Sequence, residues 1–456
     1  MTISSRQLWR LAIPIILANL TVPLLGAVDT ALAGHFQNEA YLGGVALGGQ
    51  VFTLLYWSLS FLRMGTTGLT AQSAGEGSRR LARLIFWRGL ILASALGSAF
   101  ILLEPVILYL LHEAVRTGPD VRAVADLYIS VRLWSAPASL GNFVVLGWLL
   151  GRLQARTALG LQLLINGVNA VLALFFVIGL GWGVAGIAGA TALADGIGLA
   201  VGLSVVCRPL ERETVTLTWR ELIEPQSLGQ FMAINRDIFV RTLCLLAAFA
   251  LFTLEGARQG DLFLATNAVL LTFQNIASFG LDGIAQATEV LVGAAIGAGD
   301  RPGFRQAARL SLISAFLAGG VMSLVFLVTG PLLITLLSDL PEIIANALTF
   351  LPWVVLWPLI AVWGYQLDGI FIGATRAREM RNAMGISLAL FVLAALSLEP
   401  AFGNHGLWAA LTLFMASRAI TLAFYFTRIE RHIIPVSSRR ESSHATILGG
   451  DSPARP

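Results

Sequence analysis

Residues 8–34, LWRLAIPIILANLTVPLLGAVDTALAG, form a continuous apolar run near the start of the chain. About 20 mainly apolar residues are enough for a helix to cross a bilayer, so this run predicts a membrane-spanning helix. Arg6 and Arg10 near the start of the run and Ala31-Leu32-Ala33 at its end resemble a secretory signal peptide. However, the run is about twice the usual length of a signal core and contains Asp29, which favours a helix that is retained.

The composition of the whole chain agrees with a membrane protein. Of its 456 residues, 56% are hydrophobic and only 12% are charged, whereas a soluble protein has about 25% charged residues. This excludes a soluble enzyme and a secreted domain. All 30 basic residues are arginine and the net charge is +4. Their short clusters indicate membrane topology rather than nucleic-acid binding. Cys207 and Cys244 lack metal-site spacing and are expected to pack in apolar runs.

The sequence predicts twelve spans separated by turn signals. They cover 8–34, 41–71, 85–110, 122–150, 157–180, 183–206, 232–256, 262–297, 306–336, 342–374, 382–400 and 404–428. When the loops between these spans are taken alternately, 24 arginines fall on the side of the two termini, including Arg236 and Arg241 near the central linker. Three fall on the other side, and Arg63, Arg132 and Arg418 fall inside spans. Because basic loops remain in the cytoplasm, we expect a multi-pass protein of the bacterial inner membrane with both termini cytoplasmic.

The chain also contains an internal duplication with a spacing of 222 residues. Gly147, Gly151, Ala155 and Arg156 recur as Gly369, Gly373, Ala377 and Arg378, and Gly75, Gly77 and Arg79 recur as Gly297, Gly299 and Arg301. Six spans separate equivalent points, so the two halves have the same orientation, as in transporters that enclose a substrate path between rocking halves.

The predicted fold is therefore an all-α integral membrane protein with twelve transmembrane helices in two pseudo-symmetric six-helix lobes. We place the N-terminal lobe at 1–207, a cytoplasmic linker at 208–230, the C-terminal lobe at 231–432 and a disordered cytoplasmic tail at 433–456.

Five acidic residues fall inside the predicted spans: Asp29, Asp195, Asp282, Glu289 and Asp368. Ionisable residues in the membrane are costly and are functional candidates. The three arginines inside spans do not neutralise five carboxylates, so at least two carboxyl groups must be solvated, hydrogen-bonded or protonated. Burial favours the neutral form of a carboxyl group, which makes such a residue a candidate proton carrier.

Asp29 is the strongest candidate for a proton carrier. Pro14 and Pro23 precede it on the same helix, and each removes a backbone hydrogen bond and permits a bend. An acid on a bendable helix is able to couple its protonation to a change of helix shape. The alternative is a solvated acid near the membrane surface.

Other polar residues are candidates for sites in each half. Asn142, Asn166, Asn169 and Thr191 are expected to surround Asp29 in the first half, although hydrogen bonding between helices explains them equally well. Asp195 and Arg418 occupy corresponding places in the two halves, where either a structural or a coupling role fits. Asp282 and Glu289 share one helix face and, with Asp368, form either a second cation or proton site or a buried polar network.

Several stretches resemble the multidrug and toxic compound extrusion (MATE) transporters. LTVPLLGAVDTALAGHFQNEAYLGGVAL (20–47) is similar to their first helix and the turn that follows it. RLWSAPASLGNFVVLGWLLGRLQAR (132–156), LDGIFIGATRAREMRN (367–382) and GNHGLWAALT (403–412) resemble the DinF-like bacterial branch. The likeness covers about residues 6 to 430 and excludes the tail.

This resemblance implies a V-shaped pair of lobes that exports hydrophobic, often cationic compounds in exchange for protons or sodium. Asp29 matches the family's essential acid on helix 1, and Asn142, Asn169 and Thr191 match polar residues around it. Many relatives carry an acid four residues after the helix 5 asparagine, where this chain has Ala173. The first-lobe site is thus incomplete unless Asp195 supplies the second acid.

We therefore expect a proton-coupled antiporter for amphipathic, mainly cationic compounds or drugs. A sodium-coupled exporter and a flippase for a lipid-linked precursor remain as alternatives. The flippase requires a strongly cationic cavity, and a membrane-embedded enzyme requires a catalytic cluster or metal ligands. We expect no enzyme activity, no cofactor beyond the coupling ion, and no nucleic-acid partner. The chain should work as a monomer with small-molecule substrates and the lipid bilayer as its partners.

Overall fold

The computed structural model describes residues 3–34, 39–211, 217–431 and 433. The predicted tail after residue 433 and part of the predicted linker lie outside the described residues. Within these ranges the chain is helical and contains no strand. The helices of the first half are α1 (Ser5–Gly34), α2 (Glu39–Ser58), α3 (Phe61–Glu76), α4 (Arg79–Leu102), α5 (Glu104–Ala114), α6 (Pro119–Leu133), α7 (Ala136–Gly151), α8 (Ala155–Leu174), the π-helical turn η1 (Phe175–Gly179) and α9 (Gly183–Glu211). Those that follow are α10 (Trp219–Leu222), α11 (Pro225–Arg258), α12 (Asp261–Gly297), α13 (Arg301–Leu337), α14 (Pro341–Gly373), α15 (Ala377–Phe402) and α16 (Asn404–Arg431).

These helices confirm the predicted twelve-span fold. Eleven helical segments among the described residues are long and apolar enough to cross a membrane, and the bent pair α6 and α7 makes a twelfth. The bend between α6 and α7 is 54°. A side chain on Gly97 of α4 would collide with the backbone of Pro137, so a glycine is required where α4 crosses the start of α7.

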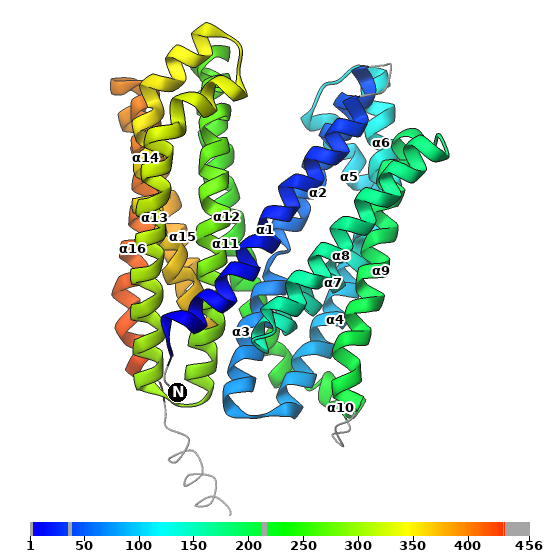
Figure 1. Cartoon of the computed structure of the whole chain (residues 1–456), viewed down its shortest axis with the longest axis vertical. Helices are drawn as coiled ribbons and strands as arrows, with labels where there is room; N and C mark the ends of the chain where they lie inside the picture. Colours follow the sequence, from blue (N-terminus) through cyan, green and yellow to red (C-terminus); the bar gives the residue numbers. More distant parts are fainter. Residues whose placement is uncertain (1–2, 35–38, 212–216, 432, 434–456) are drawn as a thin grey trace, which may run out of the picture.

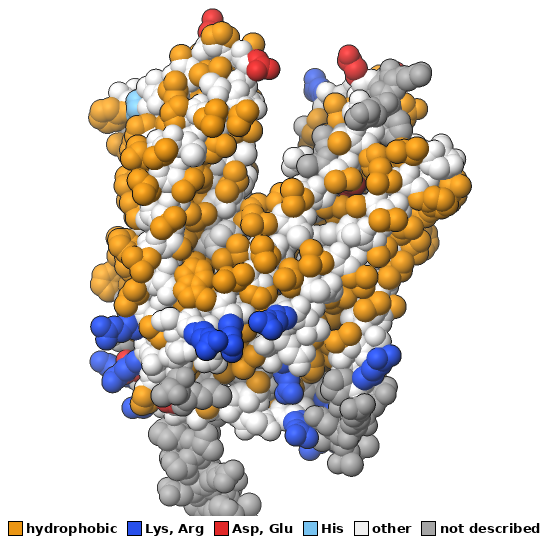
Figure 2. Space-filling view, viewed as in Figure 1, with side chains coloured by type: hydrophobic (Ala, Val, Ile, Leu, Met, Phe, Trp, Pro, Cys, Tyr) orange, Lys and Arg blue, Asp and Glu red, His pale blue; other side chains and the backbone are white. Residues whose placement is uncertain are grey.

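The helices form two bundles that meet at one end and diverge at the other, as Figure 1 shows. We call α1–α9 the first lobe and α11–α16 the second lobe. Helix α1 runs between them and packs on both α8 and α12. Figure 2 shows that the space between the diverging ends is a cleft and that arginines gather at the converging end.

The two lobes meet where α3 packs on α12. A side chain on Gly75 would collide with the carbonyl of Ala294, and one on Gly297 would collide with the carbonyl of Gln72. These two glycines are equivalent positions of the 222-residue repeat, so each half contributes the same small residue to the shared interface. Close helix contact through small residues is typical of helix packing in membranes.

The repeat is also visible in the backbone. Leu153 (φ 63°) and Thr375 (φ 54°) are the two non-glycine residues with a left-handed backbone in the described chain, and they are 222 residues apart. Ser78 and Asp300 are equivalent helix caps. The Ser78 hydroxyl accepts from a backbone N–H three residues later at 3.3 Å, and the Asp300 carboxylate does the same at 2.9 Å. Equivalent turns and caps therefore recur in both halves.

Helices α9 and α11 both extend into the predicted linker 208–230. Helix α9 continues to Glu211 and α11 begins at Pro225. Between them, α10 is attached to the first lobe because Arg88 of α4 donates to the carbonyls of Glu221 (2.6 Å) and Leu222 (3.0 Å).

Candidate transport site

Asp29 lies on α1 facing the first lobe, with 9% of its surface exposed. Its Oδ1 accepts no hydrogen bond from the described residues. The nearby cation is Arg132 of α6, which acts on Asp29 electrostatically. Asp29 is therefore a nearly buried carboxyl group whose Oδ1 receives, from the described residues, no hydrogen bond that would stabilise a carboxylate.

Arg132 is held by aromatic side chains rather than by an ion pair. Its Nη1 donates to the hydroxyl of Tyr128 at 2.6 Å, and its guanidinium lies 4.5 Å from the ring centre of Phe52. From this position it acts electrostatically on both Asp29 and Asp195. Arg132 is thus the nearby positive charge for both acids.

Asp195 of α9 lies at the bend between α6 and α7. Its Oδ2 accepts hydrogen bonds from Ser135, at 3.2 Å, and from Ser139. Asn142 donates to the backbone carbonyl of Asp195 at 3.0 Å. A break in a membrane helix exposes backbone and side-chain polar groups, which is where transporters place their sites. The bend supplies the serines that bind Asp195.

The remaining first-lobe candidates form separate pairs. Asn169 donates to Thr191 at 3.0 Å, and Asn166 donates to Thr21 of α1 at 2.6 Å. The predicted group is thus divided into Asn142 with Asp195, Asn169 with Thr191, and Asn166 with α1. Ala173 is completely buried and adds no polar atom.

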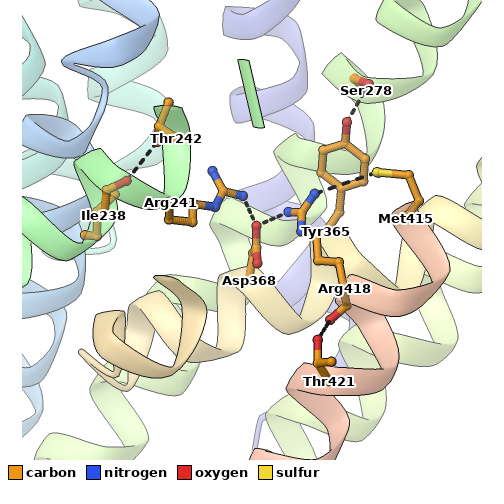
Figure 3. Close-up of polar contacts among 9 residues, drawn as sticks. All are labelled: Ile238, Arg241, Thr242, Ser278, Tyr365, Asp368, Met415, Arg418 and Thr421. Atoms are coloured by element: carbon orange, nitrogen blue, oxygen red, sulfur yellow. Dashed lines mark hydrogen bonds and ion pairs between the residues drawn. The ribbon is translucent and has the colours of Figure 1, made fainter. Parts of the chain in front are cut away.

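Asp368 of α14 is the centre of the second-lobe site. Its Oδ2 accepts from both Arg241 of α11 and Arg418 of α16, as Figure 3 shows. Arg418 is 1% exposed, and its guanidinium lies 5.5 Å from the ring centre of Tyr365. The Tyr365 hydroxyl is 2.6 Å from the Ser278 hydroxyl. Asp368 is therefore a carboxylate between two fixed cations.

The other two acids of α12 do not join Asp368. Asp282 accepts from Gln286 at 2.5 Å and lies within electrostatic range of Arg241. Glu289, with 1% exposure, lies where α12 meets α3 and is within electrostatic range of Arg63. The sequence grouped these acids in one second-lobe site, whereas Glu289 belongs to the interface of the lobes. No group of three or more potential metal ligands occurs in the described part of the chain.

Arg241 is the important residue that the sequence did not identify. It was counted with the cytoplasmic arginines near the linker, but it is 5% exposed inside α11 and bound to Asp368. Its position well inside the predicted span 232–256 was the available signal. With Arg241 included, three arginines balance the charges of three acids. The arginines are Arg63, Arg241 and Arg418, and the acids are Asp282, Glu289 and Asp368. In the first lobe, Asp29 and Asp195 have only Arg132.

Comparisons with known proteins agree with this architecture. The MatE family model matches residues 14–194 and 238–397. The chain is 41% identical to the DNA damage-inducible protein F of Escherichia coli K12 over 94% of this chain and 93% of that one. It is 27% identical to a probable multidrug resistance protein NorM of Rhizobium meliloti, over 93% of each.

A solved structure described as the outward-facing conformation of a multidrug resistance MATE family transporter superposes with a TM-score of 0.85. The match covers 94% of this chain and 96% of that one at 20% identity. The resemblance found in the sequence is thus confirmed, as is the expectation of a transporter rather than an enzyme. The chain belongs to the MatE family of multidrug efflux transporters.

Proposed function

We propose that this chain exports amphipathic organic compounds, mainly cations, in exchange for protons. We further propose that it works as a monomer in a bacterial inner membrane with both termini in the cytoplasm. The arginines at the converging end of the lobes support this orientation, because basic segments stay in the cytoplasm. In that orientation the cleft opens to the outside, which is the state in which an exporter releases its cargo.

The proposal of proton coupling depends mainly on the unpaired state of Asp29. Two first-lobe acids share Arg132, and Asp29 has neither a hydrogen bond to Oδ1 nor a direct ion pair with a described residue. Protonation removes the charge of such a group altogether, which is the least costly way to keep a carboxyl group in an apolar lobe. A proton arriving from the cleft would neutralise Asp29 and release a cationic cargo bound there.

The form of α1 supports a coupled movement. Asn166 ties Thr21 of α1 to α8, and Pro23 follows two residues later. Asp29 lies beyond that proline, so the part of α1 that carries it is able to bend while the part before it stays attached. Protonation of Asp29 would weaken its attraction to Arg132 and permit this bend.

The alternative of sodium coupling is less well supported by either lobe. Sodium is bound by several oxygen ligands, among which carboxylates are the strongest. In the second lobe two guanidinium groups occupy the Oδ2 side of Asp368. In the first lobe Ala173 supplies no oxygen. The flippase alternative requires a strongly cationic cavity, but in the first-lobe site two acids, Asp29 and Asp195, share a single nearby arginine, Arg132.

Everted membrane vesicles provide a test of both the direction and the ion. Uptake of a fluorescent organic cation, which corresponds to export from the cell, should follow an imposed proton gradient in sodium-free buffer and collapse with a protonophore. Uptake that requires sodium and ignores the protonophore would contradict the proposal and favour the sodium alternative. Vesicles without the protein and vesicles with Asp29→Asn serve as controls.

A further inference from the structure

A cavity of about 150 Å³ lies beside α1. Helices α1, α7 and α8 form most of its wall, and α3 and α12 each contribute one residue. Apolar side chains such as Val22, Phe143 and Leu146 make up most of the lining. Neither Asp29 nor Asp195 is part of it. The cavity is thus a second candidate site with a different chemistry.

Arg63 is the one charged residue in this lining. Its Nη1 is buried and donates no hydrogen bond to a described residue. Glu289 on α12 lies within electrostatic range, but no hydrogen bond joins the two side chains. A buried guanidinium N–H without an acceptor is costly, so a ligand oxygen that reached Arg63 would add a hydrogen bond that Glu289 does not supply.

The polar neighbours of Arg63 in the lining are three amides, each of which already donates one hydrogen bond to a described residue. Gln162 donates to Asn166 at 3.1 Å, Gln286 donates to Asp282 at 2.5 Å, and Asn19 donates to the carbonyl of Phe279 at 3.5 Å. Their side-chain oxygens have no hydrogen-bond donor among the described residues. The cavity therefore offers one cation, several acceptors and an apolar wall.

We propose that this cavity binds amphipathic organic acids. The carboxylate of the ligand would accept from Arg63, its apolar body would lie against α1 and α7, and its hydroxyl or N–H groups would donate to the amide oxygens. A guanidinium binds a carboxylate strongly because its N–H donors match the two oxygens. The inference depends on the proposed function only in treating the chain as a transporter, since binding itself needs no ion gradient.

Equilibrium binding to the purified protein in lipid nanodiscs tests this proposal. The probes are naphthalene-1-acetate and (naphthalen-1-ylmethyl)trimethylammonium, which share a ring system and carry opposite charges. We expect Arg63→Gln to weaken binding of the acid about tenfold or more, as loss of a charged hydrogen bond does, and to leave binding of the cation unchanged. Arg63→Lys should retain part of the acid binding, and Arg309→Gln, an exposed arginine on α13, is the matched control.

Two further variants separate binding from folding. Arg63→Gln leaves Glu289 without its nearby cation, so Arg63→Gln/Glu289→Gln restores the charge balance and should still lose the acid. Leu146→Trp fills the cavity with Arg63 intact and should also abolish acid binding. Acid binding unchanged in these variants, or absent from the unaltered protein, would overturn the proposal. If the unaltered protein bound the acid but showed no proton-driven transport, that result would contradict the proposed function and leave this proposal standing.

Discussion

In the first lobe two acids, Asp29 and Asp195, share one arginine, whereas in the second lobe one acid, Asp368, binds two. Both sites are buried and both lie between helices that the repeat makes equivalent. The difference is that the second-lobe carboxylate forms direct ion pairs with two cations, whereas Asp29 forms none with the described residues and has only the electrostatic effect of Arg132. A proton is useful as a coupling ion only where its arrival changes the charge balance. We therefore propose that the first lobe couples transport to protons and that the second-lobe site stabilises the fold.

The largest effect should come from removing the first-lobe acid. Asp29→Asn keeps the size and polarity of the side chain but has no titratable proton. We expect proton-driven efflux to fall to the level of vesicles without the protein, with little change in thermal stability because Oδ1 makes no hydrogen bond that would be lost. Efflux at equal expression measures this, and Asp29→Glu should recover part of the activity. Unaltered efflux by the Asn variant would remove Asp29 from the mechanism.

The second-lobe acid should show the opposite profile, with a large effect on stability. Asp368→Asn leaves Arg241 and Arg418 buried without their carboxylate, and breaking a buried ion pair in this way costs about 3–5 kcal/mol. We expect a clear drop in melting temperature, measured on the purified protein by size-exclusion chromatography after heating. Arg241→Gln added to Asp368→Asn should restore part of it.

Efflux by second-lobe variants tests whether the acids of the two lobes differ in their role in transport. The double variant Asp282→Asn/Asp368→Asn should lose less efflux per folded molecule than Asp29→Asn does. If the double variant were inactive and Asp29→Asn active, the second lobe would be the coupling lobe.

Straightening α1 should have an intermediate effect. Pro23→Ala restores a backbone hydrogen bond between the attached part of α1 and the part that carries Asp29. We expect slower turnover with unchanged cargo affinity, measured as initial efflux rates over a range of cargo concentrations. Pro14→Ala, on the other side of the Thr21 attachment, is the matched control and should change the rate less.

The smallest effect should come from the attachment itself. Asn166→Ala removes one hydrogen bond between α8 and α1, worth about 0.5–1.5 kcal/mol. We expect a melting temperature slightly below that of the unaltered protein and efflux reduced only modestly. A loss as large as that of Asp29→Asn would mean that Asn166 takes part in coupling directly.

The sequence predicted the twelve spans well because a long apolar run in a bilayer forms a membrane-spanning helix. The predicted 262–297 is α12 (Asp261–Gly297), and the predicted 404–428 is α16 (Asn404–Arg431). The bend in the span 122–150 was not predicted: this run is divided into α6 and α7 at 54°. Pro137 at the start of α7 was the available local signal, because a proline interrupts the hydrogen bonds of a helix, but its packing against Gly97 of α4 required the structure.

The site residues were predictable by type but not by partner. An acid in an apolar run is visible in the sequence, as Asp29 and Asp368 were. Their partners come from other helices: Arg132 lies near Asp29 only after folding, and Arg241 meets Asp368 across 127 residues of chain. The distribution of charge between the lobes therefore required the structure.

Proton movement driven by a cargo gradient is the direct test of whether Asp29 couples export to protons. The purified protein is reconstituted in sodium-free liposomes that contain a pH-sensitive dye, and a gradient of an organic cation is imposed. If Asp29 couples transport to protons, the unaltered protein should show proton flow opposite to the cargo. The Asp29→Asn variant should show no such flow despite normal folding. Proton flow that persists in Asp29→Asn, or cargo movement in the unaltered protein that begins only when sodium is added, would contradict this role of Asp29.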